Sequence, residues 1–227
     1  MEDEFIQHCR TNNLNGVNYC LSRGVDVNTK ESYYQRTGLW YACDRGNSAI
    51  VSRLLQVPGL DINYQADGWT AAIWASRKGR TEIVRILAQT GKVDWNKGDK
   101  WDQTPLFWAL RKFQSDIGIV DIILQQPNIE YNVKDINGDT LAEAAVSGGD
   151  VKCVETLTAQ ERCDCWNVPD TDGDTPIMRA LKYGMTKIVE ILLRCPRVDL
   201  SCRDEGGWSL VFRAIQRNKL GEKCRNI

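Results

Sequence analysis

One sequence pattern recurs about every 34 residues along almost the whole chain. Its clearest copies are residues 70–75, 104–109 and 175–180, where a Thr precedes small and apolar residues and an Ala ends the motif. Taking that last small residue as a marker places the copies at positions 9, 42, 75, 109, 145, 180 and 214. A fixed period in this range is the signature of a repeat architecture, so the chain is predicted to be a stack of similar units.

Each copy predicts two short antiparallel helices. Thr70 is placed to cap the first helix, and Pro105 and Pro176 fall at the first helical position in their copies. Gly79 and its equivalents lie four residues after the marker and break the chain before an Ile, Val and Leu-rich second helix. A single helix pair cannot bury its apolar stripe, so neighbouring copies must stack. Between copies, segments such as 64–69 contain Asp-Gly turns and predict hairpin-like fingers.

The period, the Thr-Pro-Leu motif and the second apolar helix resemble the ankyrin repeat family. This resemblance implies an all-α ankyrin-repeat α-solenoid of stacked helix-turn-helix units with finger loops. We expect a single domain over 1–227, in which the last copy is a half-repeat cap or the edge of a longer array. Where the family motif has a His, this chain has other residues, so the usual hydrogen bond is absent or replaced by packing: Gln7, Trp40, Ile73, Phe107, Glu143, Met178 and Phe212. The predicted repeats are 1–29, 30–63, 64–96, 97–132, 133–167, 168–201 and a partial 202–227.

Composition narrows the function. The net charge is −1, apolar runs are far shorter than a bilayer span, and the acidic start does not resemble an export signal. We therefore expect a cytoplasmic or nuclear protein with reduced thiols. The nine cysteines form no CxxC pair and His8 is the single histidine, so neither a metal site nor a cofactor is expected. Residues 170–174 are Asp-rich but do not match a calcium-binding loop. No nucleophile–base pair or phosphate-binding loop is recognisable, which argues against an enzyme.

Aromatic and cationic residues gather where repeats of this type have their concave face. Positions one before and three after the marker are four residues apart, so their side chains share one face of the first helix. The alternative is that Trp74 and Trp108 are core between repeats and the cations are a solvated rim, whereas the finger residues Trp69 and Trp101 are harder to bury. The residues predicted to contact a partner are Tyr33, Tyr34, Arg36, Tyr41, Arg45, Trp69, Trp74, Arg77, Lys78, Trp101, Trp108, Arg111 and Lys112.

The predicted function is that of a non-enzymatic protein–protein interaction module or scaffold, monomeric by itself, whose partner is an acidic or phosphorylated segment. The alternative is a ligand sensor that stacks a nucleotide or a short single-stranded oligonucleotide on the aromatics. Residues 1–113 contain 15 basic and 12 acidic residues, and residues 114–227 contain 14 and 18, so charge changes from +3 to −4 along the chain. This split either orients a ligand or reflects drift among solvated loops.

The resemblance also implies a modification site, because ankyrin repeats are substrates for hydroxylation at the Asn that closes a repeat. Asn63 and Asn132 fit, since a Leu lies eight residues before each of them. The alternative is that these asparagines cap the finger turn structurally.

Overall fold

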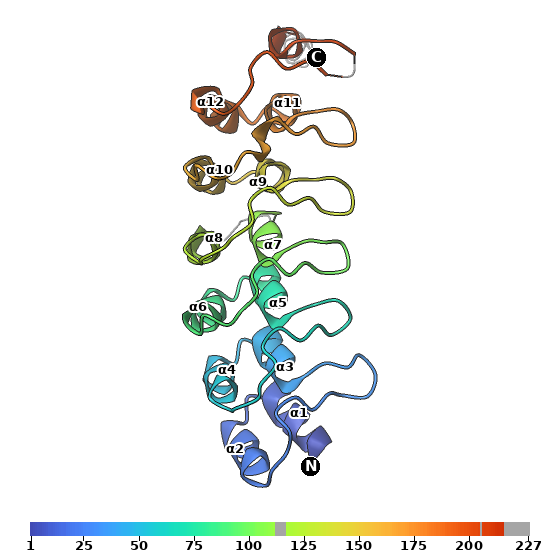
Figure 1. Cartoon of the computed structure of the whole chain (residues 1–227), viewed down its shortest axis with the longest axis vertical. Helices are drawn as coiled ribbons and strands as arrows, with labels where there is room; N and C mark the ends of the chain where they lie inside the picture. Colours follow the sequence, from blue (N-terminus) through green and yellow to red (C-terminus); the bar gives the residue numbers. More distant parts are fainter. Residues whose placement is uncertain (112–116, 205, 216–227) are drawn as a thin grey trace, which may run out of the picture. The chain divides into compact units, whose positions relative to one another are not determined.

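The computed structural model describes residues 1–111, 117–204 and 206–215. Helices occur in pairs along this part of the chain, as the repeats predict, and the expected all-α ankyrin-type fold is confirmed (Figure 1). The helices are α1 (Glu2–Arg10), α2 (Leu14–Ser22), α3 (Gly38–Arg45), α4 (Ser48–Leu55), α5 (Ala71–Lys78), α6 (Thr81–Gln89), α7 (Pro105–Arg111), α8 (Ile117–Leu124), α9 (Leu141–Gly148), α10 (Val151–Thr158), the 3-10 helix η1 (Cys165–Asn167), α11 (Pro176–Tyr183) and α12 (Thr186–Arg194).

In three of the described pairs, those of α3, α5 and α9, the first helix begins at the predicted Thr and ends at the predicted Gly. The Thr70 side chain accepts a hydrogen bond from the Ile73 N–H at the start of α5, and Thr37 and Thr140 do the same for α3 and α9. At the other end Gly79 has a φ of 69°, in the left-handed region that glycine adopts without strain. This turn reverses the chain into α6, so the cap and the glycine fix the length of the first helix.

The chain forms two compact units. Unit 1 contains the described residues within Met1–Ala109 and Asp116–Ile129, and unit 2 those within Leu110–Ser115 and Glu130–Ile227. In unit 1, α1, α3 and α5 pack in series, and α4, α6 and α8 form a second series. In unit 2, α9 packs against α11 and α10 against α12. The apolar stripes of these helices, including Leu54, Ile73 and Leu87 of unit 1 and Val154 and Leu192 of unit 2, are fully buried.

In several repeats, an aspartate at the base of the finger holds the finger turn through hydrogen bonds. The carboxylate oxygen Oδ1 of Asp99 accepts hydrogen bonds from the N–H groups two and four residues later, and Asp135 and Asp170 repeat this arrangement. Isolated antiparallel bridges, such as Lys134 with Thr140, close the fingers. The predicted hairpin-like fingers are therefore present, and their first aspartate holds the turn from within.

The asparagines that close the repeats join one repeat to the next. Asn63 donates from Nδ2 to the Lys92 carbonyl at 3.0 Å, and its Oδ1 accepts from the Asp94 N–H at 2.9 Å. Asn28 makes the same two bonds to the following repeat. Asn132 is exposed, and its Oδ1 accepts from the Asp164 N–H at 3.0 Å. These asparagines therefore have a structural role, as the alternative interpretation of the sequence stated. They link successive repeats, however, rather than cap a finger turn.

Candidate partner-binding site

Five indole rings of unit 1 form one cluster, which we call the tryptophan cluster. Trp40 comes from α3, Trp74 from α5 and Trp108 from α7, whereas Trp69 and Trp101 come from the fingers before α5 and α7. Ring centroids are 4.9 Å apart for Trp40 and Trp74, 5.1 Å for Trp69 and Trp74, 5.3 Å for Trp69 and Trp108, and 5.7 Å for Trp69 and Trp101. The helices and fingers of three successive repeats therefore contribute to one aromatic surface.

The rings of this cluster differ in how deeply they are buried. Trp69 is only 8% exposed, so the expectation that a finger tryptophan is hard to bury is wrong for this residue. It is covered because Trp74, Trp101 and Trp108 surround it. Those three rings are half-buried, so each packs on the protein with one part and faces solvent with another. The two interpretations of Trp74 and Trp108, core or surface, are therefore both partly correct.

Carboxylates fix two of the half-buried rings. The indole N–H of Trp74 donates to Asp44 at 2.6 Å, and that of Trp108 donates to Asp99 at 2.9 Å. Asp99 is the same residue that holds the finger turn, so ring position and finger shape depend on one carboxylate. A hydrogen bond to a charged acceptor also increases electron density on the indole, which strengthens the attraction between its face and a cation.

Arg77 is the cation at the centre of the cluster. Its guanidinium carbon lies 5.0 Å from the ring centroid of Trp69, 4.9 Å from that of Trp74 and 5.0 Å from that of Trp108. The side chain is exposed, and it makes no hydrogen bond or ion pair with the residues that the structure describes. The neighbouring Lys78 lies over Trp74, with its Nζ 5.0 Å from the ring centroid. Three indole rings thus surround the guanidinium, and no carboxylate of the described residues pairs with it.

The finger before α3 adds a second aromatic and cationic group. Arg36 lies between Tyr34 and Trp40, 4.3 Å and 4.1 Å from their ring centroids. Tyr33 and Tyr34 are 78% and 47% exposed, and the Glu31 carboxylate accepts hydrogen bonds from both of their N–H groups. The two tyrosines therefore project from an ordered tip rather than lie on the helices.

Tyr41 and Arg45 do not join the surface as expected. Tyr41 is 8% exposed and packs edge-on against Trp40, because its position on α3 faces the preceding repeat, where Arg10 lies over its ring. Arg45 is exposed but pairs with Asp44 at 3.5 Å. Arg111 belongs to unit 2, and Lys112 lies outside the described residues.

The sequence prediction omitted two residues of this site, the buried Trp40, which packs against Trp74, and the exposed Lys100. Trp40 occupies the position where the family motif has a His, and that departure was the available signal. Lys100 precedes Trp101 in the finger, and its Nζ lies 4.5 Å from that ring centroid. A cation adjacent to an aromatic at a finger tip was the signal in this case.

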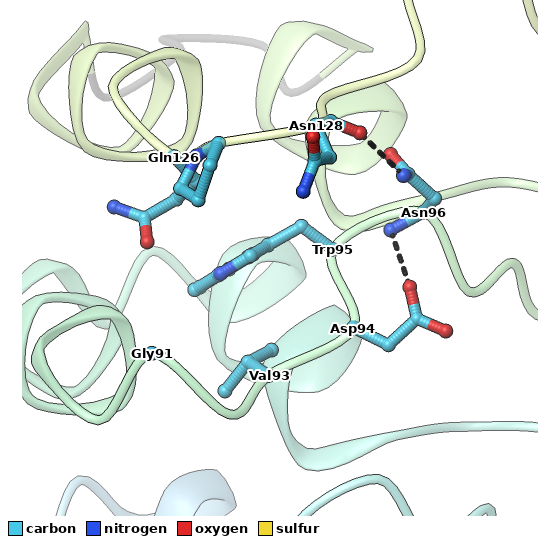
Figure 2. A pocket seen from close by; sticks show the side chains of 8 residues that line it. Gly91, Val93, Asp94, Trp95, Asn96, Gln126 and Asn128 are labelled. Atoms are coloured by element: carbon cyan, nitrogen blue, oxygen red, sulfur yellow. Dashed lines mark hydrogen bonds between the residues drawn. The ribbon is translucent and has the colours of Figure 1, made fainter.

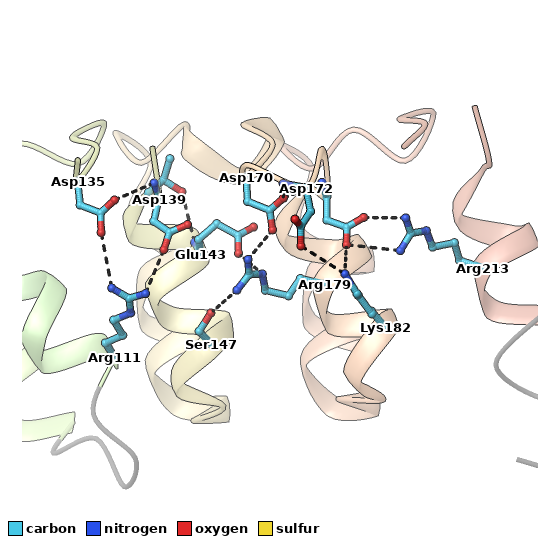
Figure 3. A network of polar contacts seen from close by, with 12 residues as sticks. Arg111, Asp135, Asp139, Glu143, Ser147, Asp170, Asp172, Arg179, Lys182 and Arg213 are labelled. Atoms are coloured by element: carbon cyan, nitrogen blue, oxygen red, sulfur yellow. Dashed lines mark hydrogen bonds and ion pairs between the residues drawn. The ribbon is translucent and has the colours of Figure 1, made fainter. Parts of the chain in front are cut away.

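Cations on the corresponding helices of unit 2 are neutralised by finger aspartates (Figure 3). Arg111 pairs with Asp135 at 3.6 Å and Asp139 at 3.1 Å. Further pairs join Arg179 to Glu143 and Asp170, Lys182 to Asp172 and Asp174, and Arg213 to Asp174 and Asp204. Seven acidic residues of unit 2, six finger aspartates and Glu143, are thus engaged with cations of the same unit, an outcome that neither sequence interpretation of the charge split included.

Glu143 is the most constrained member of this network. Its side chain is 1% exposed and lies 2.7 Å from Arg179, and its Oε1 has no hydrogen-bond partner in the described part of the chain. Burial raises the pKa of Glu143 to about 8, although Arg179 opposes the shift. The pKa of Asp139 is raised as well, by burial and by the neighbouring Asp135. Glu143 stands at the motif position of the family His, so packing and an ion pair replace the usual hydrogen bond.

A pocket of about 200 Å³ lies between two loops of unit 1 (Figure 2). Trp95 forms one wall, and Gln126 and Asn128 lie opposite it. This volume is below that of typical small-molecule sites, which begin at about 300 Å³. The described ranges contain no group of three His, Cys, Asp or Glu residues arranged to hold a metal ion. None of their helices has the length and apolar composition needed to cross a bilayer.

Comparisons with known proteins give one consistent result. A family model described as ankyrin repeats (three copies) matches residues 5–97, 57–135, 112–204 and 141–223. Alpha-latroinsectotoxin-Lt1a of Latrodectus tredecimguttatus is 32% identical over 139 residues, which cover 61% of this chain and 9% of the toxin. Inversin of Canis lupus familiaris is 27% identical over 207 residues, covering 72% of this chain and 19% of inversin. The chain therefore spans only a small part of these relatives.

A solved structure supports the same fold. EF0377, an ankyrin repeat protein, superimposes with a TM-score of 0.75 over 86% of this chain and 98% of its own length, at 22% sequence identity. At this identity the likeness concerns the arrangement of helices and says nothing about the ligand.

Proposed function

Because the chain belongs to the ankyrin repeat family, whose repeats generally mediate protein–protein interaction, we propose that it is a non-enzymatic interaction module for an acidic or phosphorylated segment. The binding surface is the tryptophan cluster of unit 1 together with Arg36, Arg77, Lys78 and Lys100. The observation that carries the proposal is Arg77, which three indoles hold in place without an anionic partner from the described chain.

A guanidinium held by aromatic rings suits a carboxylate or phosphate ligand. Its contacts with the rings use none of its hydrogen-bond donors, so its N–H groups can bind two oxygens of the ligand in parallel. Stacking also reduces the rotamer freedom that Arg77 would otherwise lose on binding, which lowers the entropic cost of the complex. In unit 2 the corresponding cations already form ion pairs with carboxylates of the same unit, so the same ligand would bind there with lower affinity.

The aromatic residues around these cations supply the rest of the interface. Trp, Tyr and Arg dominate binding hot spots, where truncation of one residue costs about 2 kcal/mol or more. The exposed parts of Trp74, Trp101 and Trp108 provide apolar area next to charge, and Tyr33 and Tyr34 extend it toward the finger tip. An acidic segment with interspersed apolar residues matches this combination.

The second candidate, a sensor of nucleotides or single-stranded oligonucleotides, is favoured by the same half-buried rings. Bases stack on exposed aromatic side chains while nearby cations contact the phosphates. The two candidates differ in what the aromatic rings contact, which is an apolar side chain in a peptide and a base in an oligonucleotide. Binding of a nucleic acid should therefore depend on its bases and not on its phosphates alone.

Calorimetric titration of the full chain tests the proposal. The probes are an oligoglutamate peptide, a phosphoserine peptide, an oligoglutamine peptide and a single-stranded oligothymidine. We expect binding of the two anionic peptides, no heat with oligoglutamine, and at least tenfold weaker binding after Arg77→Gln, equivalent to about 1.4 kcal/mol. Arg85→Gln, an exposed arginine on α6 that pairs with Glu82, is the matched control. Binding of oligothymidine alone supports the sensor, and equal affinity of wild type and Arg77→Gln refutes the role of Arg77.

A further inference from the structure

Two cysteines of unit 2 lie with their sulfur atoms in contact. The Sγ atoms of Cys163 and Cys165 are 3.3 Å apart, at the turn that follows α10 and at the first residue of η1. Neither is in a disulfide, and one residue separates them in sequence. Rotation about the side-chain bonds and a small change in this turn are enough to bring the sulfurs to the bonded distance of about 2.05 Å.

The two thiols are chemically unequal. A hydrogen bond from Cys163 lowers the pKa of Cys165 against the effect of burial, and the Ala142 N–H and the Thr140 hydroxyl act in the same direction. The hydrogen bond to Cys165 and burial raise the pKa of Cys163. Cys165 therefore carries the more nucleophilic sulfur, since the thiolate is the reactive form, and Cys163 holds the proton.

Exposed residues flank the buried pair in the same turn. Cys163 is 0% and Cys165 2% exposed, but Ala159, Glu161 and Asp164 in the same turn are exposed. Such short surface turns open locally at low free-energy cost, which admits a small oxidant but not a protein. Cys43, equally buried inside α3, differs because burial raises the pKa of its thiol.

We propose that Cys163 and Cys165 form a redox-sensitive dithiol that a hydroperoxide converts into a disulfide. The Cys165 thiolate attacks hydrogen peroxide, giving a sulfenic acid at Cys165 and releasing hydroxide. The Cys163 sulfur then attacks the Cys165 sulfur, its proton leaves with the sulfenic hydroxyl as water, and the S–S bond forms. The peroxide is reduced by two electrons, which the two sulfurs supply.

The expected consequence is local to the start of α9. In the dithiol form Cys165 accepts hydrogen bonds from Thr140 and Ala142, the cap and second residue of that helix. Bond formation draws Cys165 toward Cys163 and weakens those contacts. The oxidation state of the pair therefore alters the first turn of α9, which also contains Glu143 of the ion-pair network.

Peptide mapping of the wild-type chain tests the pair directly. After brief treatment with hydrogen peroxide, free thiols are alkylated and the protein is digested with trypsin. Residues 163–179 form one tryptic peptide, which contains both cysteines of the pair and no other. We expect this peptide to lose two hydrogen atoms, to resist alkylation, and to recover both thiols on reduction, whereas the peptide with Cys43 stays alkylated. A doubly alkylated 163–179 peptide under conditions that oxidise Cys202 overturns the proposal.

Two variants test the order of the steps. In Cys163→Ser the sulfenic acid at Cys165 has no resolving thiol, so a sulfenic-specific dione probe should label it. In Cys165→Ser the probe should label Cys163 far less. Equal labelling of both variants contradicts the assigned nucleophile, and a disulfide that joins either residue to a third cysteine contradicts the pairing. If either variant fails to fold, the wild-type peptide map alone decides the proposal.

Discussion

At the scale of single residues, two arginines show how neighbours decide the role of a cation. Arg77 meets three indoles and, among the described residues, no carboxylate. Arg179 meets Glu143 and Asp170, so its charge is neutralised within the protein. The same residue type thus lies among aromatic rings in unit 1, where we propose that it binds a ligand, and in an internal ion-pair network in unit 2.

We expect Glu143 to make the stability of unit 2 depend on pH. Its folded-state pKa, about 8, is above the ordinary value of 4.5, so the folded protein binds this proton more tightly than the unfolded chain does. The resulting stabilisation is fully present below pH 4.5 and is lost as the pH rises through 8. As the pH rises from 5 to 8, we expect the free energy of unfolding of unit 2 to decrease by about 1 kcal/mol or more on this account. The thermal midpoint should decrease with it. Glu143→Gln should flatten the profile measured by circular dichroism.

The control for this prediction is Glu190→Gln, which removes one charge from an exposed position on α12 of the same unit. A profile that keeps its slope in Glu143→Gln, or flattens equally in both variants, would show that Glu143 does not carry the proton.

Asn132 and Asn63 should differ as substrates of an asparaginyl hydroxylase. Asn132 is exposed and accepts one hydrogen bond through its amide oxygen, whereas the amide of Asn63 bridges Lys92 and Asp94 with two. Releasing Asn63 costs more, so we expect Asn132 to gain an oxygen atom first. Peptide mass spectrometry after incubation checks the order, with Asn28, which has Cys20 instead of Leu eight residues earlier, as the unmodified control. No mass gain at either site would remove both candidates.

At the scale of elements, the finger before α7 depends on one side chain. Asp99 accepts two backbone N–H groups through Oδ1 and the Trp108 indole through Oδ2, and it is 5% exposed. Through these bonds it fixes both the turn and a ring of the tryptophan cluster. The finger and the first residues of the following helix are therefore one structural element.

Asp99→Asn should destabilise this element while keeping its shape. The amide oxygen of Asn still accepts the backbone N–H groups, but its NH₂ faces the indole N–H of Trp108 and leaves both donors unpaired. We expect a loss of about 1–3 kcal/mol in free energy of unfolding. Asp102→Asn, at an exposed position in the same finger, should change stability little. Urea titration of the two variants measures the difference, and equal midpoints would contradict the role of Asp99.

The elements were predictable from sequence because their signals are local. Thr70, Gly79 and the apolar spacing mark the limits of each helix within a few residues of the chain. The burial of Trp69 was not predictable, because it depends on Trp101 and Trp108, which the next repeat supplies. The pairing of Arg179 with Glu143 likewise joins residues 36 positions apart. A periodic sequence shows that such residues recur, but only the stacking decides which of them meet.

At the scale of the whole molecule, net charge is a poor guide to the ligand. The chain as a whole carries −1, yet in the described part of unit 1 cations such as Arg77 and Lys78 lie over indole rings without a carboxylate partner, and most carboxylates of the unit 2 fingers are engaged. An acidic ligand is therefore attracted by a local potential rather than by the overall charge.

Raising the salt concentration should separate the contribution of exposed charges to ligand affinity from that of apolar contacts. The screening length falls from about 10 Å at 0.1 M to about 3 Å at 1 M, so exposed charges lose most of their mutual attraction over this range. We expect the affinity for an oligoglutamate peptide to fall at least tenfold between these concentrations, mainly through a slower association rate. Lys187→Ala, an exposed change on α12, should leave this dependence unaltered, whereas Lys78→Ala should reduce it. Salt-independent binding, measured by stopped-flow mixing, would indicate a purely apolar interface.

The crowding of indoles around Arg77 has an optical consequence. Six of the eight tryptophans, at positions 40, 69, 74, 95, 101 and 108, belong to unit 1, and three of them share this guanidinium. Indole emission responds to the electric field at the ring, and an anion that docks on Arg77 changes that field for three emitters together. The protein therefore carries an intrinsic fluorescent reporter at the surface that we propose binds a ligand, so occupancy should shift the emission wavelength without an attached dye.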